Sequence, residues 1–206
     1  KSIEDVTMKT STINMNKKYP TKSFQYVDVS SVNKENLRIE KTQKLLGINA
    51  PSRARRQIQE GDVIFATIRP TLKRIAIVPK ELNGQICSTG FSVLRGKKEI
   101  LDNKYLFYIL SSSITLRYMN TLQTGASYPA VTDKQMKEFM IPIPPIETQR
   151  EIADRFENII SEINKAKSLI YEVLKSYDSL KNSLLTNSFL KFSRLCSRKL
   201  ILFNSI

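Results

Sequence analysis

Two short segments of the sequence each bring three basic side chains close together. PSRARRQIQ, residues 51–59, places three arginines within four residues, and IRPTLKR, residues 68–74, places two arginines and a lysine at the expected tip of a hairpin. A guanidinium group donates paired hydrogen bonds that match a phosphate or the edge of a guanine base. We predict that both segments are loops on one anion-binding surface, although Glu60 and Asp62 lie between them. The predicted contact residues are Ser52, Arg53, Arg55, Arg56, Arg69, Lys73 and Arg74.

A third segment carries hydroxyl groups instead of charges. TGASYPAVT, residues 124–132, predicts a loop of small residues with Tyr128 at its apex and Pro129 after it. Hydroxyl groups on loops donate to phosphates or touch base edges. Ser127 and Tyr128 therefore join the predicted contact residues.

The distribution of charge indicates the class of partner. The chain has 33 Lys and Arg against 19 Asp and Glu, a net charge of +14. Residues 1–146 hold 23 basic and 12 acidic residues, whereas residues 147–186 hold 6 and 7. A basic part joined to a neutral part suggests a polyanionic partner, most simply a nucleic acid. We expect a cytoplasmic protein, because the sequence has no long apolar run that could span a membrane and its start is polar.

The competing class is an enzyme, a DNA methyltransferase in its own right, and the residue types disfavour it. The chain has no histidine, which removes the commonest general acid and base. Its six glycines never form a G-x-G cofactor loop, and Pro144 and Pro145 follow isoleucine where an amino-methyltransferase motif has Asn or Asp. Cys87 and Cys196 are expected to be free thiols. We therefore predict no catalysis, no metal site and no cofactor.

The elements that must position these residues are mixed strands and helices. Alternating or continuous apolar patterns predict the strands, and the helices follow capping residues and a helical period. The predicted strands are residues 24–32, 61–68, 74–78, 90–94 and 140–144; the predicted helices are residues 103–123, as one helix or two broken near the three serines, and residues 132–139, capped by Thr132 or Asp133.

Beyond the prolines at 142, 144 and 145, the sequence predicts a helix of about forty residues, or about 60 Å. Thr148 and Glu151 fit a capping box at its start. Stepping by four and three residues meets only apolar or aromatic side chains, which is typical of a coiled coil. No second helix of matching length exists in the chain, so we expect this stripe to pair with another molecule. The stripe comprises Ile152, Phe156, Ile159, Ile163, Ala166, Ile170, Val173, Tyr177, Leu180 and Leu184.

These motifs, taken in order, resemble a family. SRARRQIQEGDVIFATIRPTLKRIAIVP, CSTGF and GASYPAVTDKQMKEFMIPIPPIETQREI, followed by the heptad helix, resemble the specificity (S) subunits of type I restriction-modification systems. The resemblance implies an α+β chain, with a mixed α/β target recognition domain at residues 1–141 and a coiled-coil spacer helix at residues 142–190. Residues 191–206 form a tail of unknown role.

The resemblance also implies a function. Such subunits perform no chemistry; they bind double-stranded DNA at one half of a split site and recruit a methyltransferase (M) subunit and, through it, a restriction (R) subunit. The usual member carries the unit twice, and this chain carries it once, so we expect a homodimer through the helix or pairing with a different half-subunit. The proline joint and the helix would act as a ruler between the half-sites. The alternative is a stand-alone basic coiled-coil protein that binds nucleic acid without sequence preference.

Overall fold

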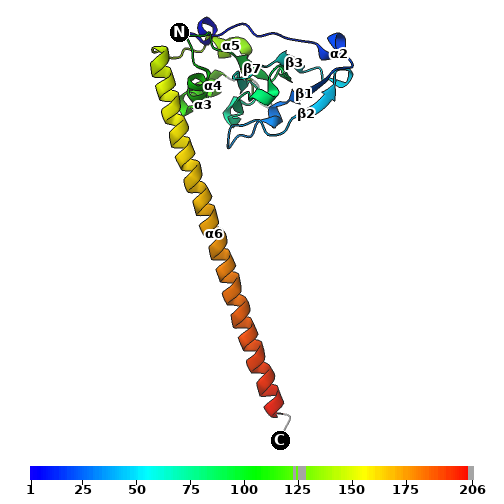
Figure 1. Ribbon diagram of the computed structural model, residues 1–206, viewed down its shortest axis with the longest axis vertical. Helices are drawn as coiled ribbons and strands as arrows, with labels where there is room; N and C mark the ends of the chain where they lie inside the picture. Colours follow the sequence, from blue (N-terminus) through cyan, green and yellow to red (C-terminus); the bar gives the residue numbers. More distant parts are fainter. Residues whose placement is uncertain (123, 125–128, 204–206) are drawn as a thin grey trace. The chain divides into compact units, whose positions relative to one another are not determined.

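The computed structural model describes residues 1–122, 124 and 129–203, with side-chain surroundings through residue 189 (Figure 1). The chain divides into two compact units, Lys1–Arg155 and Phe156–Ile206. We call the first the mixed unit and the second the helical unit.

Two β-sheets form the framework of the mixed unit (Figure 1). One has four strands in the order β2-β1-β6-β3, with β1 parallel to β6 and the other pairs antiparallel. The other has three antiparallel strands in the order β5-β4-β7. The strands are β1 Ser23–Val27, β2 Gln43–Leu46, β3 Ala54–Gln57, β4 Val63–Ala66, β5 Ile75–Ile77, β6 Ile86–Ser88 and β7 Phe91–Leu94.

The three-stranded sheet lies between two apolar clusters. Successive side chains of a strand point to opposite faces, so Val63 and Phe65 enter one cluster and Ile64 and Ala66 enter the other. Burial on both faces explains why β4 has a continuous apolar sequence. Helices supply much of the rest of the first cluster, including Leu106 and others from α3. The helices of the mixed unit are α1 Ile3–Val6, α2 Met15–Lys18, α3 Asn103–Ser111, α4 Ser113–Leu122 and α5 Asp133–Glu138; the 3-10 turns are η1 Val29–Ser31, η2 Gly47–Asn49, η3 Pro70–Leu72 and η4 Lys80–Leu82.

Most predicted elements are present, with two corrections. The serine run does break the helix, because Ser112 is extended between α3 and α4, and Thr132, rather than Asp133, caps α5 through its bond from the Gln135 N–H. The strand predicted at residues 24–32 ends at Val27, where η1 begins shortly after. Residues 140–144 form no strand, only a single bridge from Met140 to Ser2. Prolines at 142 and 144 lack the N–H that a strand would donate, which accounts for this error.

Helix α6 runs from Ile146 to Phe203, and this corrects two predictions about it. It begins before Thr148, so the predicted capping box lies within the first turns, and its backbone stays helical through most of the predicted tail. The apolar stripe is uncovered in the helical unit, where Ile163 is 47% and Val173 is 61% exposed. Ile152, predicted to belong to that stripe, instead packs against the core of the mixed unit.

The buried side chain of Gln149 fixes the start of α6 within the mixed unit. Its Nε2 donates to the carbonyl oxygens of Ile100 and Pro144 at 2.9 and 2.8 Å, and its Oε1 accepts from the N–H of Asp102 at 2.9 Å. These bonds satisfy backbone groups that the turn before α3 and the proline segment leave without a partner in a strand or helix. The start of α6 therefore depends on contacts with a segment far away in the sequence.

Replacing Gln149 tests this arrangement. Gln149→Ala removes three hydrogen bonds and leaves partly buried backbone groups without these partners, so we expect the free energy of unfolding to fall by about 2–4 kcal/mol. Thr148→Ala, the exposed neighbour, is the matched control and should change it by less than about 0.5 kcal/mol. Urea denaturation of both variants makes the comparison. Equal losses would show that the side chain of Gln149 is not what holds the helix start.

Candidate nucleic-acid interface

Backbone hydrogen bonds bring the predicted contact segments together. The turn between β6 and β7 is central: the N–H of Thr89 donates to the Arg53 carbonyl at 2.8 Å, and the N–H of Thr67 donates to the Gly90 carbonyl at 2.8 Å. Two residues after Thr67, the N–H of Arg69 donates to the carbonyl oxygen of Pro129 at 2.7 Å. The segments that begin near residues 52, 67 and 129 therefore meet around one turn.

The turn at residue 90 requires glycine for reasons of space. A Cβ atom there would lie 2.8 Å from Cγ2 of Val29 and 3.3 Å from Cδ1 of Ile68. Val29 is β-branched and has little rotamer freedom with which to move away. The glycine of the CSTGF motif thus allows two segments of the chain to approach each other closely, and the motif contributes this close approach rather than a chemical group.

The turn between β4 and β5 presents two cations on a constrained backbone. Arg69 and Lys73 flank η3, and both have left-handed backbone angles, with φ of 49° and 53°. Non-glycine residues adopt that region at a cost and only where surrounding structure imposes it. Pro70 is buried between them, while the Arg69 and Lys73 side chains are exposed. The buried Pro70 thus anchors the turn in the mixed unit, and the charged side chains of Arg69 and Lys73 face solvent.

Two of the three arginines in the first group, Arg55 and Arg56, lie on a strand, which corrects the prediction of a loop. β3 includes Ala54 and both following arginines, and its pairing with β6 shifts between Ala54 and Arg56, so that Arg55 is the extra residue of a bulge. Arg53 and Ser52 are exposed, whereas Arg55 is half-buried and donates from Nε to the Ser52 carbonyl at 2.8 Å.

Two of the predicted contact arginines are engaged inside the mixed unit. Nη2 of Arg56 lies 3.4 Å from the Asp133 carboxylate, which also accepts from Ser92 Oγ at 2.7 Å. Nη1 of Arg74 donates to the carbonyl oxygens of Val29 and Val32 at 3.2 and 2.7 Å. Both guanidinium groups therefore join separate segments of the domain.

Of the two acidic residues between the basic segments, Glu60 is exposed, but Asp62 does not reach the surface. Asp62 is 1% exposed and forms a bidentate pair with Arg95, at 2.7 Å to Nε and 2.8 Å to Nη2. This hydrogen bond raises the pKa of Arg95 above its ordinary value. The carboxylate is neutralised in the interior, so it does not weaken the positive potential around Arg53, Arg69 and Lys73.

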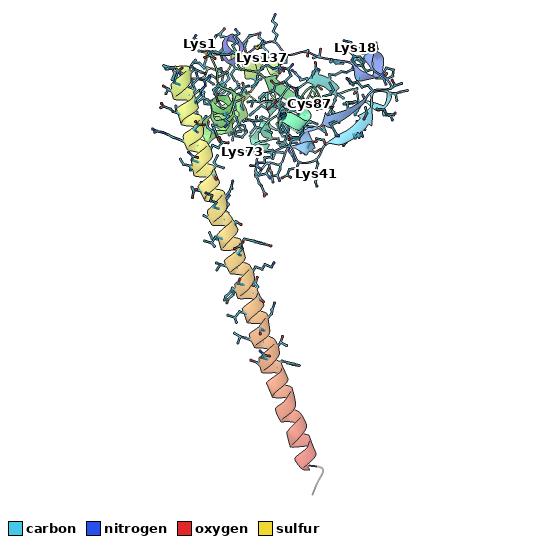
Figure 2. The ribbon with its side chains drawn as sticks, in the orientation of Figure 1. Lys1, Lys18, Lys41, Lys73, Cys87 and Lys137 are labelled. Carbon is cyan, nitrogen blue, oxygen red and sulfur yellow. The ribbon has the colours of Figure 1, made fainter. Side chains whose placement is uncertain are left out.

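The structure adds cations that we did not single out from the sequence. Lys17, Lys18 and Lys22 are exposed around Tyr19, and the amines of Lys18 and Lys22 lie 5.3 and 5.4 Å from the centre of its ring. Figure 2 labels Lys18, Lys41 and Lys73 on the mixed unit. The available signal was the absence of any Asp or Glu from residue 6 to residue 27 and from residue 41 to residue 59.

Comparison with known proteins identifies the family. The family model for the type I restriction modification DNA specificity domain matches residues 1–175. The chain belongs to this family. Among curated relatives, it is 26% identical over 144 residues to the type I restriction enzyme HindI specificity subunit of Haemophilus influenzae. The match covers 69% of this chain and 30% of that subunit.

Solved structures agree with this assignment. The HsdS subunit from Thermoanaerobacter tengcongensis is 40% identical, with a TM-score of 0.78, over 87% of this chain and 46% of the other. A chain from a structure on complex assembly and conformational transition of the type I R-M system is 39% identical, with a TM-score of 0.81, over 90% and 47%. The predicted family, the α+β fold with a long helix, and the assignment as a specificity component and not an enzyme are confirmed. The chain spans about a third of the length of the curated relatives that it matches and under half of the length of the solved ones.

Some predicted features of the specificity domain lie beyond these observations. Ser127 and Tyr128 fall outside the described residues, and Pro129, the next residue after them, is the one that accepts from Arg69. Among the residues that are described, no cluster of His, Cys, Asp or Glu could hold a metal ion. No helix in the described part of the chain is long and apolar enough to cross a membrane.

The Arg56–Asp133 contact predicts how stability depends on pH. Burial opposes ionisation of Asp133, but the hydrogen bond from Ser92 and the charges of Arg56 and Lys137 outweigh it, so the pKa of Asp133 lies below its ordinary value. A carboxylate with a depressed folded-state pKa stabilises the fold above about pH 4, and this contribution is lost as pH falls through the folded pKa.

We therefore expect the unfolding free energy of Asp133→Asn to be lower than wild type at about pH 7 and to decline less steeply below about pH 4. Asp154→Asn, which removes an exposed carboxylate of α6, is the control and should keep the wild-type slope. Urea denaturation across this pH range measures both. An unchanged acid slope in Asp133→Asn would contradict the proposed cause.

Proposed function

We propose that this chain is the DNA-recognition part of a type I restriction-modification specificity subunit and binds one half of a split duplex site. The observation that carries the proposal is the meeting of three predicted contact segments around residues 89–90. These segments carry three exposed cations, Arg53, Arg69 and Lys73, and the carboxylate of Asp62 is buried in its pair with Arg95. Phosphate contacts by such cations supply most of the affinity of a DNA-binding domain.

The partners follow from the family. A specificity subunit acts by bringing a methyltransferase (M) subunit to its site and, through the complex, a restriction (R) subunit. This chain corresponds to under half the length of the solved relatives, so a second recognition unit must come from another copy of it, a different half-subunit or the rest of a longer subunit.

Helix α6 is proposed to pair with the equivalent helix of that second unit. Its stripe from Phe156 to Leu184 is apolar and exposed, with Ile159 at 54% and Leu180 at 60%. Exposed apolar surface of this extent and heptad spacing indicates an interface between helices. In this arrangement the length of the paired helices sets the gap between the two half-sites.

Removing the three exposed cations tests the DNA-binding surface. In the variant Arg53→Ala/Arg69→Ala/Lys73→Ala, we expect weaker binding to every duplex, with a log–log salt slope that falls by about 0.9 for each phosphate that the variant no longer touches. The variant Lys167→Ala/Lys175→Ala/Lys181→Ala removes the same charge from the helical unit and should retain affinity. Fluorescence anisotropy with labelled duplexes at several salt concentrations measures both.

Two results would count against this surface. Equal affinity of the first variant and wild type would show that the DNA contacts lie elsewhere. Equal wild-type affinity for selected and scrambled duplexes, even with steep salt dependence, would favour the alternative of a nucleic-acid-binding coiled coil without sequence preference.

A single charge in the stripe tests the pairing. Ile163→Asp would bury a carboxylate in the helix interface, where desolvation costs several kcal/mol, and should dissociate the assembly while the mixed unit stays folded. Asn158→Asp adds the same charge on the polar face and should leave the assembly intact. Sedimentation velocity of the three proteins decides. If Ile163→Asp sediments like wild type and wild type is an oligomer, the stripe is not the interface.

A further inference from the structure

A polar turn beside the basic surface is built to hold a fixed conformation. Val32 and Ile39 form an antiparallel bridge, and the Asn33 N–H donates to Arg38 at 2.9 Å across its base. Oδ1 of Asn33 accepts from the N–H of Glu35 at 2.8 Å, and its Nδ2 donates to Glu40 at 3.0 Å. The hydrogen bonds that Glu40 accepts from the side chains of Asn33 and Asn36 lower its pKa and so favour the ionised carboxylate that supports the turn.

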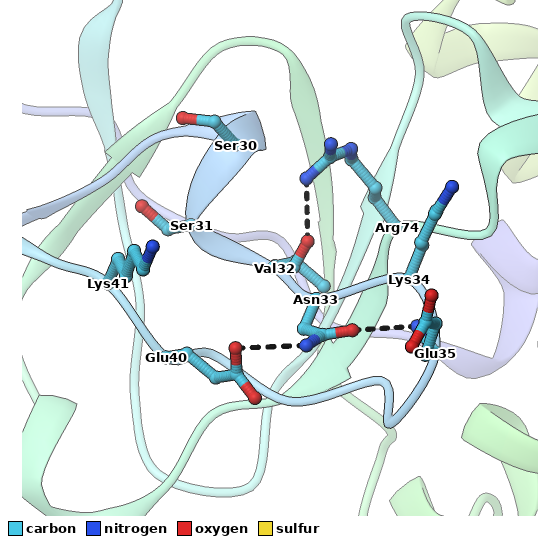
Figure 3. Close-up of a pocket in the computed structure, with 9 residues that line it drawn as sticks. All are labelled: Ser30, Ser31, Val32, Asn33, Lys34, Glu35, Glu40, Lys41 and Arg74. Atoms are coloured by element: carbon cyan, nitrogen blue, oxygen red, sulfur yellow. Dashed lines mark hydrogen bonds between the residues drawn. The ribbon is translucent and has the colours of Figure 1, made fainter. Parts of the chain in front are cut away.

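Arg74 joins this turn to the basic surface. It follows Lys73 directly, and its guanidinium donates to the Val32 carbonyl at the base of the turn (Figure 3). Arg74 and residues 30–35, 40 and 41 line a pocket of about 300 Å³. The polar turn is therefore attached to the segment that carries Arg69 and Lys73.

Two side chains of the turn are left for a ligand. Lys34 and Glu35 are exposed, and neither side chain has a hydrogen bond or ion pair with any residue that the structure describes. Figure 3 shows them next to each other at one end of the pocket, beside the Arg74 side chain. The turn thus presents one ammonium donor and one carboxylate acceptor from adjacent positions.

The presence of the carboxylates decides which part of DNA this pair fits. A phosphate is repelled by carboxylates, and Glu35 and Glu40 both line the pocket, so it is a poor phosphate site. A base pair presents donors and acceptors together. In the major groove, guanine offers O6 and N7 to a lysine, and cytosine offers its amino group to a carboxylate.

We infer that Lys34 and Glu35 read a G·C base pair in the major groove, next to the phosphates that Arg69 and Lys73 contact. This rests on the proposed function, because it assigns part of its sequence specificity to a turn that the basic motifs do not include. Lys34 donates to guanine and Glu35 accepts from cytosine. Asn33, Glu40 and Arg74 position them without touching DNA.

The test uses a library of duplexes that are randomised in their central segment. Bound duplexes are selected from it with the wild-type chain and, separately, with the variant Lys34→Ala/Glu35→Ala, which preserves the net charge. The control, Lys80→Ala/Glu81→Ala, removes an exposed pair of the same two residue types on η4. We expect the double variant to lose affinity for the wild-type motif by about ten- to a hundredfold, as one specific base contact supplies. The motif that the double variant selects should accept any base pair at one position where wild type selects G·C. The affinity of the double variant for scrambled duplexes, and the salt dependence of that affinity, should equal those of wild type.

Several outcomes overturn the inference. A uniform loss on all duplexes with a smaller salt slope would make the pair a phosphate contact, and an unchanged motif would show that the pair reads nothing. If the double variant melts at a lower temperature than wild type, Glu35→Gln, which keeps the shape of the side chain, replaces it and must also relax that one position. A wild-type chain that selects no motif overturns the proposed function together with this inference, whereas a selected motif that survives the substitutions overturns this inference alone.

Discussion

The hydrogen bonds around residues 89–90 join the two sheets, and the candidate DNA surface depends on them. Ser88 ends a strand of the four-stranded sheet and Phe91 begins a strand of the three-stranded sheet, so the chain changes sheets in this turn. The turn has room for no side chain at Gly90. Arg53 and Thr67, which bond to the two residues of the turn, are thereby held on either side of it. A larger residue at Gly90 would separate the very segments that carry the exposed cations.

The basic residues near the candidate surface divide into those whose guanidinium groups join segments of the mixed unit and those whose side chains are exposed. Arg56 lies three residues from the exposed Arg53 and Arg74 follows the exposed Lys73. Their guanidinium groups nevertheless contact Asp133 and the carbonyls of Val29 and Val32. A guanidinium can do this because it donates several hydrogen bonds in a fixed plane and is weakly hydrated compared with an ammonium. Arg56 and Arg74 therefore join segments of the mixed unit, whereas Arg53, Arg69 and Lys73 are exposed.

The two units obtain stability in different ways. The mixed unit buries two apolar clusters around a sheet, and the buried side chain of Gln149 ties the first turn of α6 to it through three hydrogen bonds. The helical unit leaves its apolar stripe exposed from Phe156 onward. An isolated amphipathic helix gains little from propensity alone and is stabilised mainly by packing of its apolar face. This difference is why a partner for the stripe belongs to the proposed function.

Periodic and local features of the protein could be predicted from the amino-acid sequence. The apolar runs at residues 63–66 and 91–94 and the heptad stripe follow from spacing within a few residues, and each is present. For the serine run and the start of α5 the sequence left two alternatives each, and the structure has the break before Ser113 and the Thr132 cap. The order of the motifs also identified the family. Such patterns depend on the geometry of one helix or strand, which the local sequence specifies.

The availability of each group for binding, by contrast, is set by the folded chain. Arg53 and Arg56 are indistinguishable by residue type, but Arg53 precedes β3 and is exposed, whereas Arg56 lies on β3 and contacts Asp133. The helix begins at Ile146 and not at Thr148 in a chain where Gln149 finds its partners near Asp102. The polar turn with Lys34 and Glu35 lies next to the basic surface through Arg74, far from it in sequence. Each outcome depends on hydrogen bonds between residues distant along the chain, and local periodicity carries no information about those partners.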